Sequence, residues 1–479
     1  MEENNKLGFW SLVMLIFVPT FGFTNITNNA VYLGPAAIPS WFLIALFYFL
    51  PMAIMFAELA DAHTNETGGI YTWIKSGLGN KWAFIGTWSY FIANLFYLQF
   101  VFSRIPVFAS WALFGENRFN DSNTYMLPLI GILMCILLTW IATKGVEKFS
   151  KISDIGGKFT LGATVLFILF AIVGFFKGTP SASEVTIEKM IPEFNVTYFA
   201  TFSWLLFAVA GAEVGGTYID KVKNAKKTFP RGVIMATILI ATSYVIGSAT
   251  VFLVASPEAL SDAGLKDASF VVYKVLAQNW GLNGKIIVQI YALILTITSI
   301  AAYTLWIESP IKAMFSEVPE NIFPKLLTKT DEKGSLINAL WIQALVVIIL
   351  IAIPLLGLES IDGFFKLITD LSALSLVLPY LIIGFAYMNF RLKGLEGEYT
   401  FFKTKTAYMT ASVIVILFSL AGFFGAGLDY VIGAETTGEA VKSILMTYGG
   451  PLILVIVGII LKDFNLKRAA LAAQKNMKS

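Results

Sequence analysis

The sequence predicts an all-α polytopic membrane protein with about twelve transmembrane helices. Three observations predict this class. The 479-residue chain is 57% hydrophobic and only 14% charged, with a mean hydropathy of +0.74. Apolar runs of roughly twenty residues, the length that crosses the hydrocarbon core, recur along the whole chain. Short polar loops separate these runs, and Lys and Arg are concentrated in alternate loops.

Each apolar run is predicted to form one helix. The first run shows no convincing signal-peptide cleavage site and is long enough to span the bilayer, so it is retained as a helix. The expected helices cover residues 8–33, 39–60, 82–114, 126–143, 154–176, 197–218, 231–255, 285–312, 336–356, 364–388, 405–425 and 447–461.

The distribution of basic residues predicts the orientation of the chain. Alternate loops place about 24 Lys and Arg on the side that holds both termini and about 8 on the opposite side. Because cytoplasmic loops carry the excess of Lys and Arg, both termini are expected to be cytoplasmic. We therefore expect a multi-pass protein in the lipid bilayer of the plasma membrane, which in a bacterium is the cytoplasmic membrane.

The composition argues against several other classes of protein. A single cysteine, Cys135, cannot form an internal disulfide, and a single histidine, His63, leaves no clustered metal ligands. We find neither a phosphate-binding G-x-x-x-x-G-K-[ST] loop nor a clustered acid–base or nucleophile set. The net charge of +3 does not favour nucleic-acid binding. We expect no enzyme activity, no metal and no cofactor.

The expected sixth helix, 197–218, is interrupted by glycines around an acidic residue. Gly211, Gly215 and Gly216 bracket Glu213, and glycine weakens a helix. Irregular backbone at membrane depth is tolerated only where it lines a cavity or is buried in protein, so this pattern indicates a binding site. A glycine-mediated helix contact with a hydrogen-bonded structural Glu213 is the alternative.

The expected first helix carries a similar interruption. Pro19 and Gly22 stand inside an apolar run with hydroxyl and amide side chains, among them Thr24 and Asn25. Interrupted helices at corresponding positions of two halves indicate a transporter built from inverted repeats. A proline kink that neighbouring helices pack around is the alternative. We expect one transporter domain over residues 1–479, with five-helix repeats at about 8–176 and 197–388 and accessory helices at about 405–461.

The expected third helix, 82–114, has one polar and aromatic face. Tyr90, Asn94 and Tyr97 are spaced i, i+4 and i+7, which places them on one side of a helix. Such a face suits a ligand, although hydrogen bonding between helices is the commoner use. Both interpretations remain open for these three residues.

Ionisable residues also stand inside the apolar runs. Charged groups at membrane depth are costly and are often functional. Arg104 and Asp370 fall near the outer ends of their helices, so we expect both side chains to extend to the membrane interface. Lys158 in the fifth helix either has a function or extends to the cytoplasmic interface.

Three segments of the chain carry family motifs. They are Glu66–Trp73 with Gly79; Glu213 followed by Asp220, Lys223, Asn224, Lys226, Lys227, Pro230 and Arg231; and Trp306–Pro324. In this order and spacing they resemble the amino acid, polyamine and organocation (APC) transporter superfamily, and within it the glutamate/GABA antiporter-like branch. The resemblance runs from about Gly8 to Lys462.

The resemblance implies a five-plus-five inverted repeat (LeuT-like fold) with helices 1 and 6 unwound at their centres. The carboxylate and amino groups of a substrate would bind the backbone exposed there, with the amide-rich end of a half-helix taking the carboxylate. The glycine–serine–glycine motif of the family corresponds to Gly22, Phe23 and Thr24, so only the first glycine is kept. Asn25 and Gly211 belong to the same unwound turns.

The same resemblance implies side chains around the site. Asn94 matches an asparagine that selects the substrate side chain in amine-exchanging members. Phe207 corresponds to the aromatic gate before the helix 6 break, where the family has tryptophan. Tyr303 stands in place of a stacking tryptophan in helix 8. Tyr90 and Tyr97, taken from the polar and aromatic face of the third helix and not from the resemblance, complete the predicted substrate site.

Three residues are predicted to couple transport to an ion. Glu213, beside an unwound helix, is placed to take up and release a proton. Related folds hold Na⁺ between helices 1, 5 and 8, where Ser299 would supply a hydroxyl group. Lys158 is predicted to place an ammonium group in that space and to make transport independent of sodium. The helix 5 lysine of the family aligns about two residues later, over half a helical turn away.

We therefore expect a secondary transporter that moves small amino acids or their amine derivatives by alternating access, as an amino acid/amine antiporter. A symporter coupled to H⁺ is the alternative within the same fold. An ion channel is less favoured, because the apolar helices show no continuous polar pore. The sequence indicates neither the particular substrate nor the oligomeric state.

Overall fold

The computed structural model describes residues 6–63, 69–123, 125–144, 147–315, 322–331, 335–352 and 361–476. These residues are almost entirely helical. Within them, the β contact is an isolated parallel bridge between Leu7 and Val222. The predicted all-α class is confirmed.

The N-terminal part of the chain forms the helices α1 to α8. α3 and α4 are continuous through a π-helical turn at Ala45–Phe49, just before Pro51. The wider turn accommodates a proline, which has no N–H to donate. The bounds are α1 (Phe9–Thr20), α2 (Phe23–Leu33), α3 (Ala37–Ile44), α4 (Leu50–Ala62), α5 (Gly69–Leu78), α6 (Asn80–Phe114), α7 (Met126–Ala142) and α8 (Glu147–Phe176).

The C-terminal part of the chain contains the remaining helices. A 3-10 helix, η5, follows α10 and continues the predicted sixth helix after its break. The bounds are α9 (Ile187–Met190), α10 (Val196–Ala208), η5 (Ala212–Lys221), α11 (Ala225–Val254), α12 (Pro257–Asn279), α13 (Gly284–Phe315), α14 (Lys325–Thr328), α15 (Ile337–Ala352), α16 (Ile361–Leu392), α17 (Lys405–Gly425), α18 (Leu428–Ile432), α19 (Thr437–Ile444) and α20 (Gly450–Asn476).

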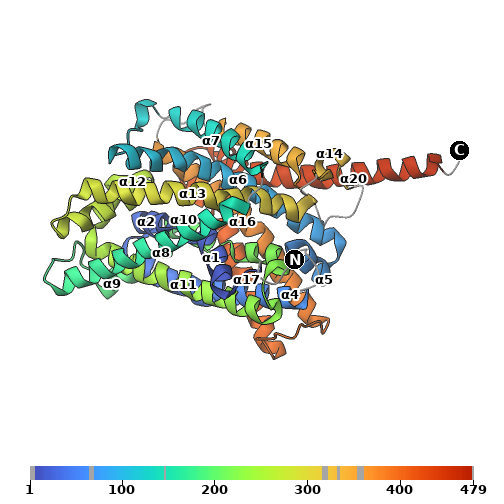
Figure 1. Cartoon of the computed structure of the whole chain (residues 1–479), viewed down its shortest axis with the longest axis horizontal. Helices are drawn as coiled ribbons and strands as arrows, with labels where there is room; N and C mark the ends of the chain where they lie inside the picture. Colours follow the sequence, from blue (N-terminus) through green and yellow to red (C-terminus); the bar gives the residue numbers. More distant parts are fainter. Residues whose placement is uncertain are drawn as a thin grey trace.

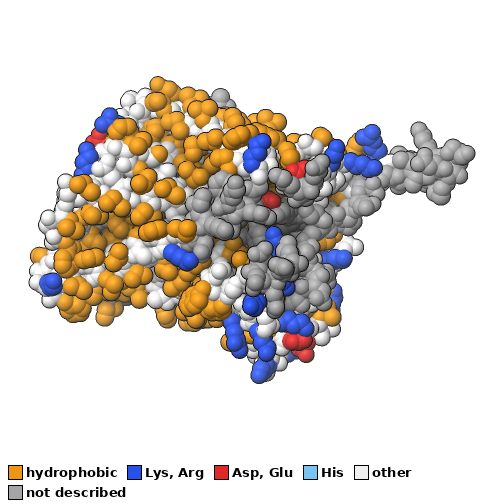
Figure 2. All heavy atoms as spheres, viewed as in Figure 1, with side chains coloured by type: hydrophobic (Ala, Val, Ile, Leu, Met, Phe, Trp, Pro, Cys, Tyr) orange, Lys and Arg blue, Asp and Glu red, His pale blue; other side chains and the backbone are white. Residues whose placement is uncertain are grey.

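The helices are suited to a membrane. In the described part of the chain, 8 helical segments are long and apolar enough to cross a bilayer, and α7, α10 and α15 are shorter apolar helices. The segment Phe9–Ala62 contains two of the expected spans. Figure 2 shows hydrophobic side chains over much of the face in view, with Lys and Arg mostly toward its right-hand and lower ends. Such a broad apolar surface is expected where lipid is the solvent.

Helices from both parts of the chain meet at the centre of the molecule. α6 packs against α13 and α16, and α1 packs against α8 and α11. Figure 1 shows α1, α10 and α16 in the middle, with α7 and α15 along one edge and α11 along the opposite edge. This arrangement places the two interrupted helices beside each other.

Candidate functional site

The first transmembrane helix is broken where the sequence predicts. α1 ends at Thr20, α2 begins at Phe23, and Phe21 and Gly22 between them have extended backbone. Pro19 in the last turn of α1 lacks an N–H, so one backbone hydrogen bond is missing from that turn and the helix end is weakened. Helix ends of this kind leave backbone N–H and C=O groups free for a ligand.

The sixth transmembrane helix is broken at Gly211. The backbone leaves α10 after Ala208 and turns through Gly211, whose φ of +131° is a conformation that L side chains rarely adopt. A Cβ at Gly211 would also collide with the Thr20 hydroxyl group. Glycine is therefore required here, and the two helix breaks are in direct contact.

The hydroxyl group of Tyr244 on α11 joins the two breaks. It accepts hydrogen bonds from Gly22 N at 3.3 Å and Asn25 Nδ2 at 3.1 Å. It lies 3.1 Å from the carbonyl oxygen of Thr20 and 2.9 Å from that of Ala208. Its single proton can be donated to either of these two oxygens. Sequence reasoning missed Tyr244, because a tyrosine inside an apolar helix gives no local signal of these distant partners.

A cavity with a volume of about 100 Å³ lies beside the breaks. This volume is several times the ~10–15 Å³ that one water molecule requires. The ring of Phe23 packs against the rings of Phe167 and Tyr273, both with centroids 4.9 Å away. The predicted site residues that line the cavity are Gly22, Phe23, Thr24, Asn25, Tyr97, Phe207, Ser299 and Tyr303.

Aromatic rings form one wall of the cavity. The ring of Tyr97 lies 5.9 Å from that of Phe207 and 6.1 Å from that of Tyr303, which approach from α10 and α13. Trp306, one turn after Tyr303, also lines the cavity, and its ring lies 4.9 Å from that of Tyr97. Trp306 was absent from the predicted site.

The predicted polar face of α6 extends past the cavity. Tyr97 lines the cavity, whereas Asn94 Nδ2 donates to the carbonyl oxygen of Trp306 at 3.0 Å and Tyr90 donates to Glu213 Oε1 at 3.1 Å. Tyr90 stands seven residues before Tyr97, which is about 10 Å along the helix axis. Asn94 and Tyr90 therefore form hydrogen bonds to other helices, which is the use that the alternative interpretation predicts.

Glu213 accepts hydrogen bonds at the break of the sixth helix. Its side chain is buried, and Oε2 accepts a hydrogen bond from Gly211 N at 3.0 Å. With the bond from Tyr90 to Oε1, both carboxylate oxygens are engaged. Neither Glu213 nor Gly211 lines the cavity. This geometry is that of a structural carboxylate, and the coupling role of Glu213 stays a prediction.

Lys158 lies outside the space in which its ammonium group was expected. Its side chain is exposed and does not line the cavity, whereas Thr160 does. Two residues correspond to about 200° of rotation around a helix, which explains the difference. The hydroxyl groups of Thr20, Thr160 and Thr298 line the cavity and have no hydrogen-bond partner among the described residues.

Arg104 and Asp370 do not extend to the membrane interface, so both predictions are wrong. Arg104 is 4% exposed and lines the cavity. Asp370 is fully buried, accepts a hydrogen bond from Trp204 Nε1 at 2.6 Å and forms an ion pair with Lys366 at 3.1 Å. Trp204 and the carbonyl group that binds Arg104 lie far away in sequence, so reasoning from a single helix could not find them.

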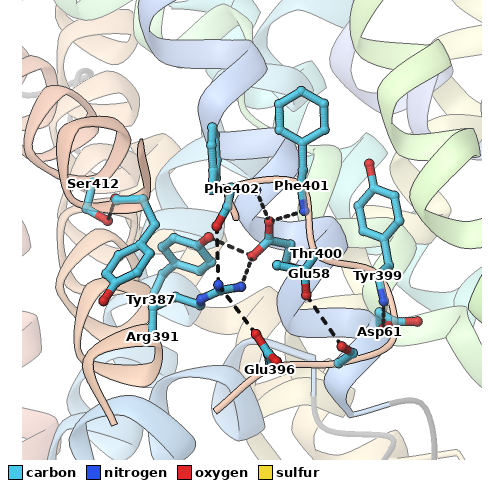
Figure 3. Close-up of polar contacts among 12 residues, drawn as sticks. Glu58, Asp61, Tyr387, Arg391, Glu396, Tyr399, Thr400, Phe401, Phe402 and Ser412 are labelled. Atoms are coloured by element: carbon cyan, nitrogen blue, oxygen red, sulfur yellow. Dashed lines mark hydrogen bonds and ion pairs between the residues drawn. The ribbon is translucent and has the colours of Figure 1, made fainter. Parts of the chain in front are cut away.

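A second buried polar group was missed entirely. Glu58 on α4 accepts hydrogen bonds at Oε1 from Phe401 N at 2.7 Å and Phe402 N at 2.9 Å. Its Oε2 accepts from Tyr387 at 2.7 Å and from Arg391 Nη1 at 2.9 Å (Figure 3). We call these five residues the Glu58–Arg391 cluster. It ties α4 and α16 to the segment that leads into α17.

The family motifs are only partly described. Residues 64–68 and 316–321 lie outside the described residues, so Glu66 and residues 316–321 of the Trp306–Pro324 segment are not placed. Trp73 packs so closely against Gly216 that a Cβ there would overlap its ring. The first and second motif segments therefore meet in the fold.

The fold and site together define a multi-pass helical membrane protein with two broken helices beside a polar and aromatic cavity. The family model for amino acid permeases matches residues 7–459. The chain therefore belongs to the amino acid permease family, and the predicted resemblance is confirmed. Proteins of this family transport amino acids across membranes and are not enzymes.

Curated relatives cover most of the chain. The aspartate/glutamate permease AcaP of Lactococcus lactis subsp. cremoris (strain MG1363) is 27% identical over 471 residues, 96% of this chain and 95% of the relative. The inner membrane transporter YjeM of Escherichia coli (strain K12) is 27% identical over 440 residues, 86% of this chain and 87% of the relative. A glutamate/gamma-aminobutyrate antiporter of Lactococcus lactis subsp. lactis (strain IL1403) is 22% identical over 408 residues, 83% of this chain and 78% of the relative.

Proposed function

We propose that the chain is a secondary transporter that exchanges a small amino acid for a related amino acid or amine by alternating access. The observation that carries the proposal is the direct contact of the two helix breaks, at Thr20 and Gly211, beside a cavity lined by aromatic rings. Broken helices let half-helices move separately around a fixed site. The relatives named for aspartate, glutamate and gamma-aminobutyrate support an amino acid or amine substrate.

The substrate would bind the exposed backbone between the half-helices. The N-terminus of α2, at Phe23 and Thr24, presents N–H groups and the positive end of a helix dipole to a carboxylate. The carbonyl oxygens at the end of α1 would take the amino group. Phe207 and Tyr303 would cover the ligand from two helices and exclude water.

The same proposal includes the organisation and orientation of the chain. Residues 8–176 and 197–388 would form the two inverted repeats, with the helices at 405–461 outside them. Both termini would be cytoplasmic, because the loops on their side carry most of the Lys and Arg. Reaction of single engineered cysteines at each terminus with an impermeant thiol reagent, in intact and opened cells, tests this orientation.

Exchange is tested with purified protein in liposomes. We expect uptake of a labelled amino acid to require unlabelled amino acid or amine inside the liposomes. Uptake into empty liposomes that follows an imposed ion gradient would indicate symport instead. Flux that neither internal substrate nor a gradient of a second ion affects would indicate a channel or a uniporter.

Cation-coupled symport is the second candidate function. The hydroxyl groups of Thr20, Thr160 and Thr298, which have no partner among the described residues, favour it, because hydroxyl and carbonyl oxygens from broken helices can coordinate Na⁺. Sodium-stimulated uptake would support this candidate and would rule out the sodium independence predicted from Lys158. For coupling to H⁺, Glu213→Gln keeps the side-chain shape and removes the titratable group. A Gln variant with the wild-type pH profile would exclude Glu213 as the coupling residue.

A further inference from the structure

Arg104 brings a positive charge to the wall of the central cavity. It stands on α6 in a row with Tyr97, Phe100 and Phe108, which also line the cavity. Its side chain is 4% exposed. A charge this deeply buried is costly unless another group compensates it.

The contacts of Arg104 use only part of its hydrogen-bonding capacity. Nη2 donates to the carbonyl oxygen of Leu265 on α12 at 3.1 Å. When the Asn28 amide is oriented to satisfy both of its ends, its Oδ1 accepts from the same Nη2 at 3.0 Å. The guanidinium carbon lies 4.7 Å from the ring centroid of Phe100. A guanidinium has five N–H donors, and Nε and Nη1 donate no hydrogen bond to any described residue.

Arg104 forms no ion pair with a residue in the part of the chain that the structure describes. Three buried carboxylates have other partners: Asp370 pairs with Lys366, Glu58 pairs with Arg391, and Glu213 accepts a hydrogen bond from Gly211 N at the helix break. The positive charge at the cavity therefore lacks a protein counter-charge among the described residues. A carboxylate of a bound ligand would supply one.

We propose that Arg104 binds the side-chain carboxylate of the substrate, so that the transporter selects acidic amino acids. The inference rests on the proposed transport of an amino acid through this cavity. The planar guanidinium group presents parallel N–H donors that match both oxygens of a carboxylate. An arginine in a largely desolvated wall discriminates strongly against a neutral side chain, which leaves the charge uncompensated.

The geometry separates this subsite from the proposed site of the α-carboxylate. Asn28, which touches Arg104, stands five residues after Phe23, or about 7.5 Å along the axis of α2. A dicarboxylic amino acid can therefore place one carboxylate at the start of α2 and the other at Arg104. Loss of the α-carboxylate by decarboxylation leaves the side-chain carboxylate in place, so the same arginine would hold an exchanged product.

The test compares acidic substrates with their amides in proteoliposomes. L-Glutamate and L-glutamine differ little in shape but differ by one charge, as do L-aspartate and L-asparagine. We expect Arg104→Gln to weaken the apparent affinity for the acids on the order of 100-fold, while the amides bind as well as before or better. Arg104→Lys should retain part of the preference for acids. Arg118→Gln is the matched control, because Arg118 pairs with Glu116 on the exposed surface.

The outcomes separate this inference from the function on which it rests. Equal loss of acids and amides in Arg104→Gln would show a structural role and overturn the inference. If that variant does not fold, competition on the wild-type protein decides, and a preference for the amide over the acid, or no preference, overturns it. A wild-type protein that exchanges amides or amines but rejects acids overturns the inference and leaves amino acid exchange standing. A protein that moves no amino acid or amine overturns both.

Discussion

The Glu58–Arg391 cluster and the central cavity are both buried and polar, yet they differ in how far their polar groups are satisfied. Each oxygen of Glu58 accepts two hydrogen bonds, and the side chains of Glu58 and Arg391 are 2% and 6% exposed. In the cavity, Thr20, Thr160 and Thr298 have hydroxyl groups without described partners. Arg104 has no described counter-charge.

The difference in hydrogen-bond partners distinguishes groups that stabilise the fold from groups that can bind a ligand. A buried polar group without a partner costs free energy, and native proteins keep few of them. Several around one cavity are explained if a ligand supplies the missing partners during transport. Both carboxylate oxygens of Glu58 already have their hydrogen-bond partners, so this cluster should contribute to stability rather than to ligand binding.

The largest expected effect is on the cluster. Arg391→Met leaves the Glu58 carboxylate buried without its cation, and breaking a buried pair in this way costs about 3–5 kcal/mol. We expect a large fall in the thermal unfolding midpoint of the purified protein. Lys226→Met, which breaks the exposed pair with Glu398, should lower the midpoint far less, because water screens the charges of an exposed pair. Similar falls for both variants would contradict the comparison.

Tyr244→Phe should have an intermediate effect on both stability and transport. The change removes the hydroxyl group that joins Gly22, Asn25 and the carbonyl oxygens of the two breaks. Leaving these groups without a partner costs about 1–3 kcal/mol. Because Tyr244 positions the unwound turns, the exchange rate should fall further than the loss of folded protein explains. A wild-type exchange rate in this variant would show that the Tyr244 hydroxyl group does not position the unwound turns.

Phe207→Ala and Tyr303→Ala should each weaken the apparent substrate affinity in the proteoliposome assay. Aromatic contacts with a ligand are worth about 0.5–1.5 kcal/mol each, which corresponds to roughly 2- to 10-fold. The amount of folded protein, measured by size-exclusion chromatography, serves as the control. If both variants transport with unchanged apparent affinity, the two rings do not close the site.

The smallest expected effect is a pH dependence at Asp267 on α12, outside the membrane spans. Burial raises the pKa of its carboxyl group from 3.8 to about 6, and the hydrogen bond from Trp111 at 2.7 Å only partly opposes this rise. The folded state therefore binds this proton more tightly, and stability is lost as the pH rises through about 6. Unfolding should cost about 1 kcal/mol more near pH 5 than near pH 7.5. Asp267→Asn should abolish this difference, and an unchanged pH dependence would exclude Asp267 as its source.

The sequence predicted the features that have local signals. Pro19, Gly22 and Gly211 interrupt apolar runs, and the breaks are found at these positions. The spacing on α6 predicted a shared face but not where the cavity ends along it. Tyr244 and Arg104 were missed or misplaced, because their partners lie up to 224 residues away in the chain. Such groups are identified only when the packing of distant helices is known.

Ligand-induced stabilisation tests most directly whether the central cavity is the substrate-binding site. A ligand that binds only the folded protein at about 100 times its Kd adds about 2.7 kcal/mol of stability. Unfolding midpoints of wild type, Arg391→Met and Gly22→Ala are measured with and without the amino acid that the liposome assay identifies. A Cβ at Gly22 would lie 3.3 Å from the side chain of Asn25 and 3.5 Å from that of Thr24, so the fold should tolerate it with small side-chain shifts.

We expect opposite behaviour from the two variants. Arg391→Met should unfold at a lower temperature but keep the increase that the ligand produces. Gly22→Ala should unfold near the wild-type temperature but lose that increase, because the methyl group stands where the substrate would meet the backbone. A Gly22→Ala variant that is stabilised by the ligand as strongly as the wild type would contradict the assignment of the cavity as the binding site.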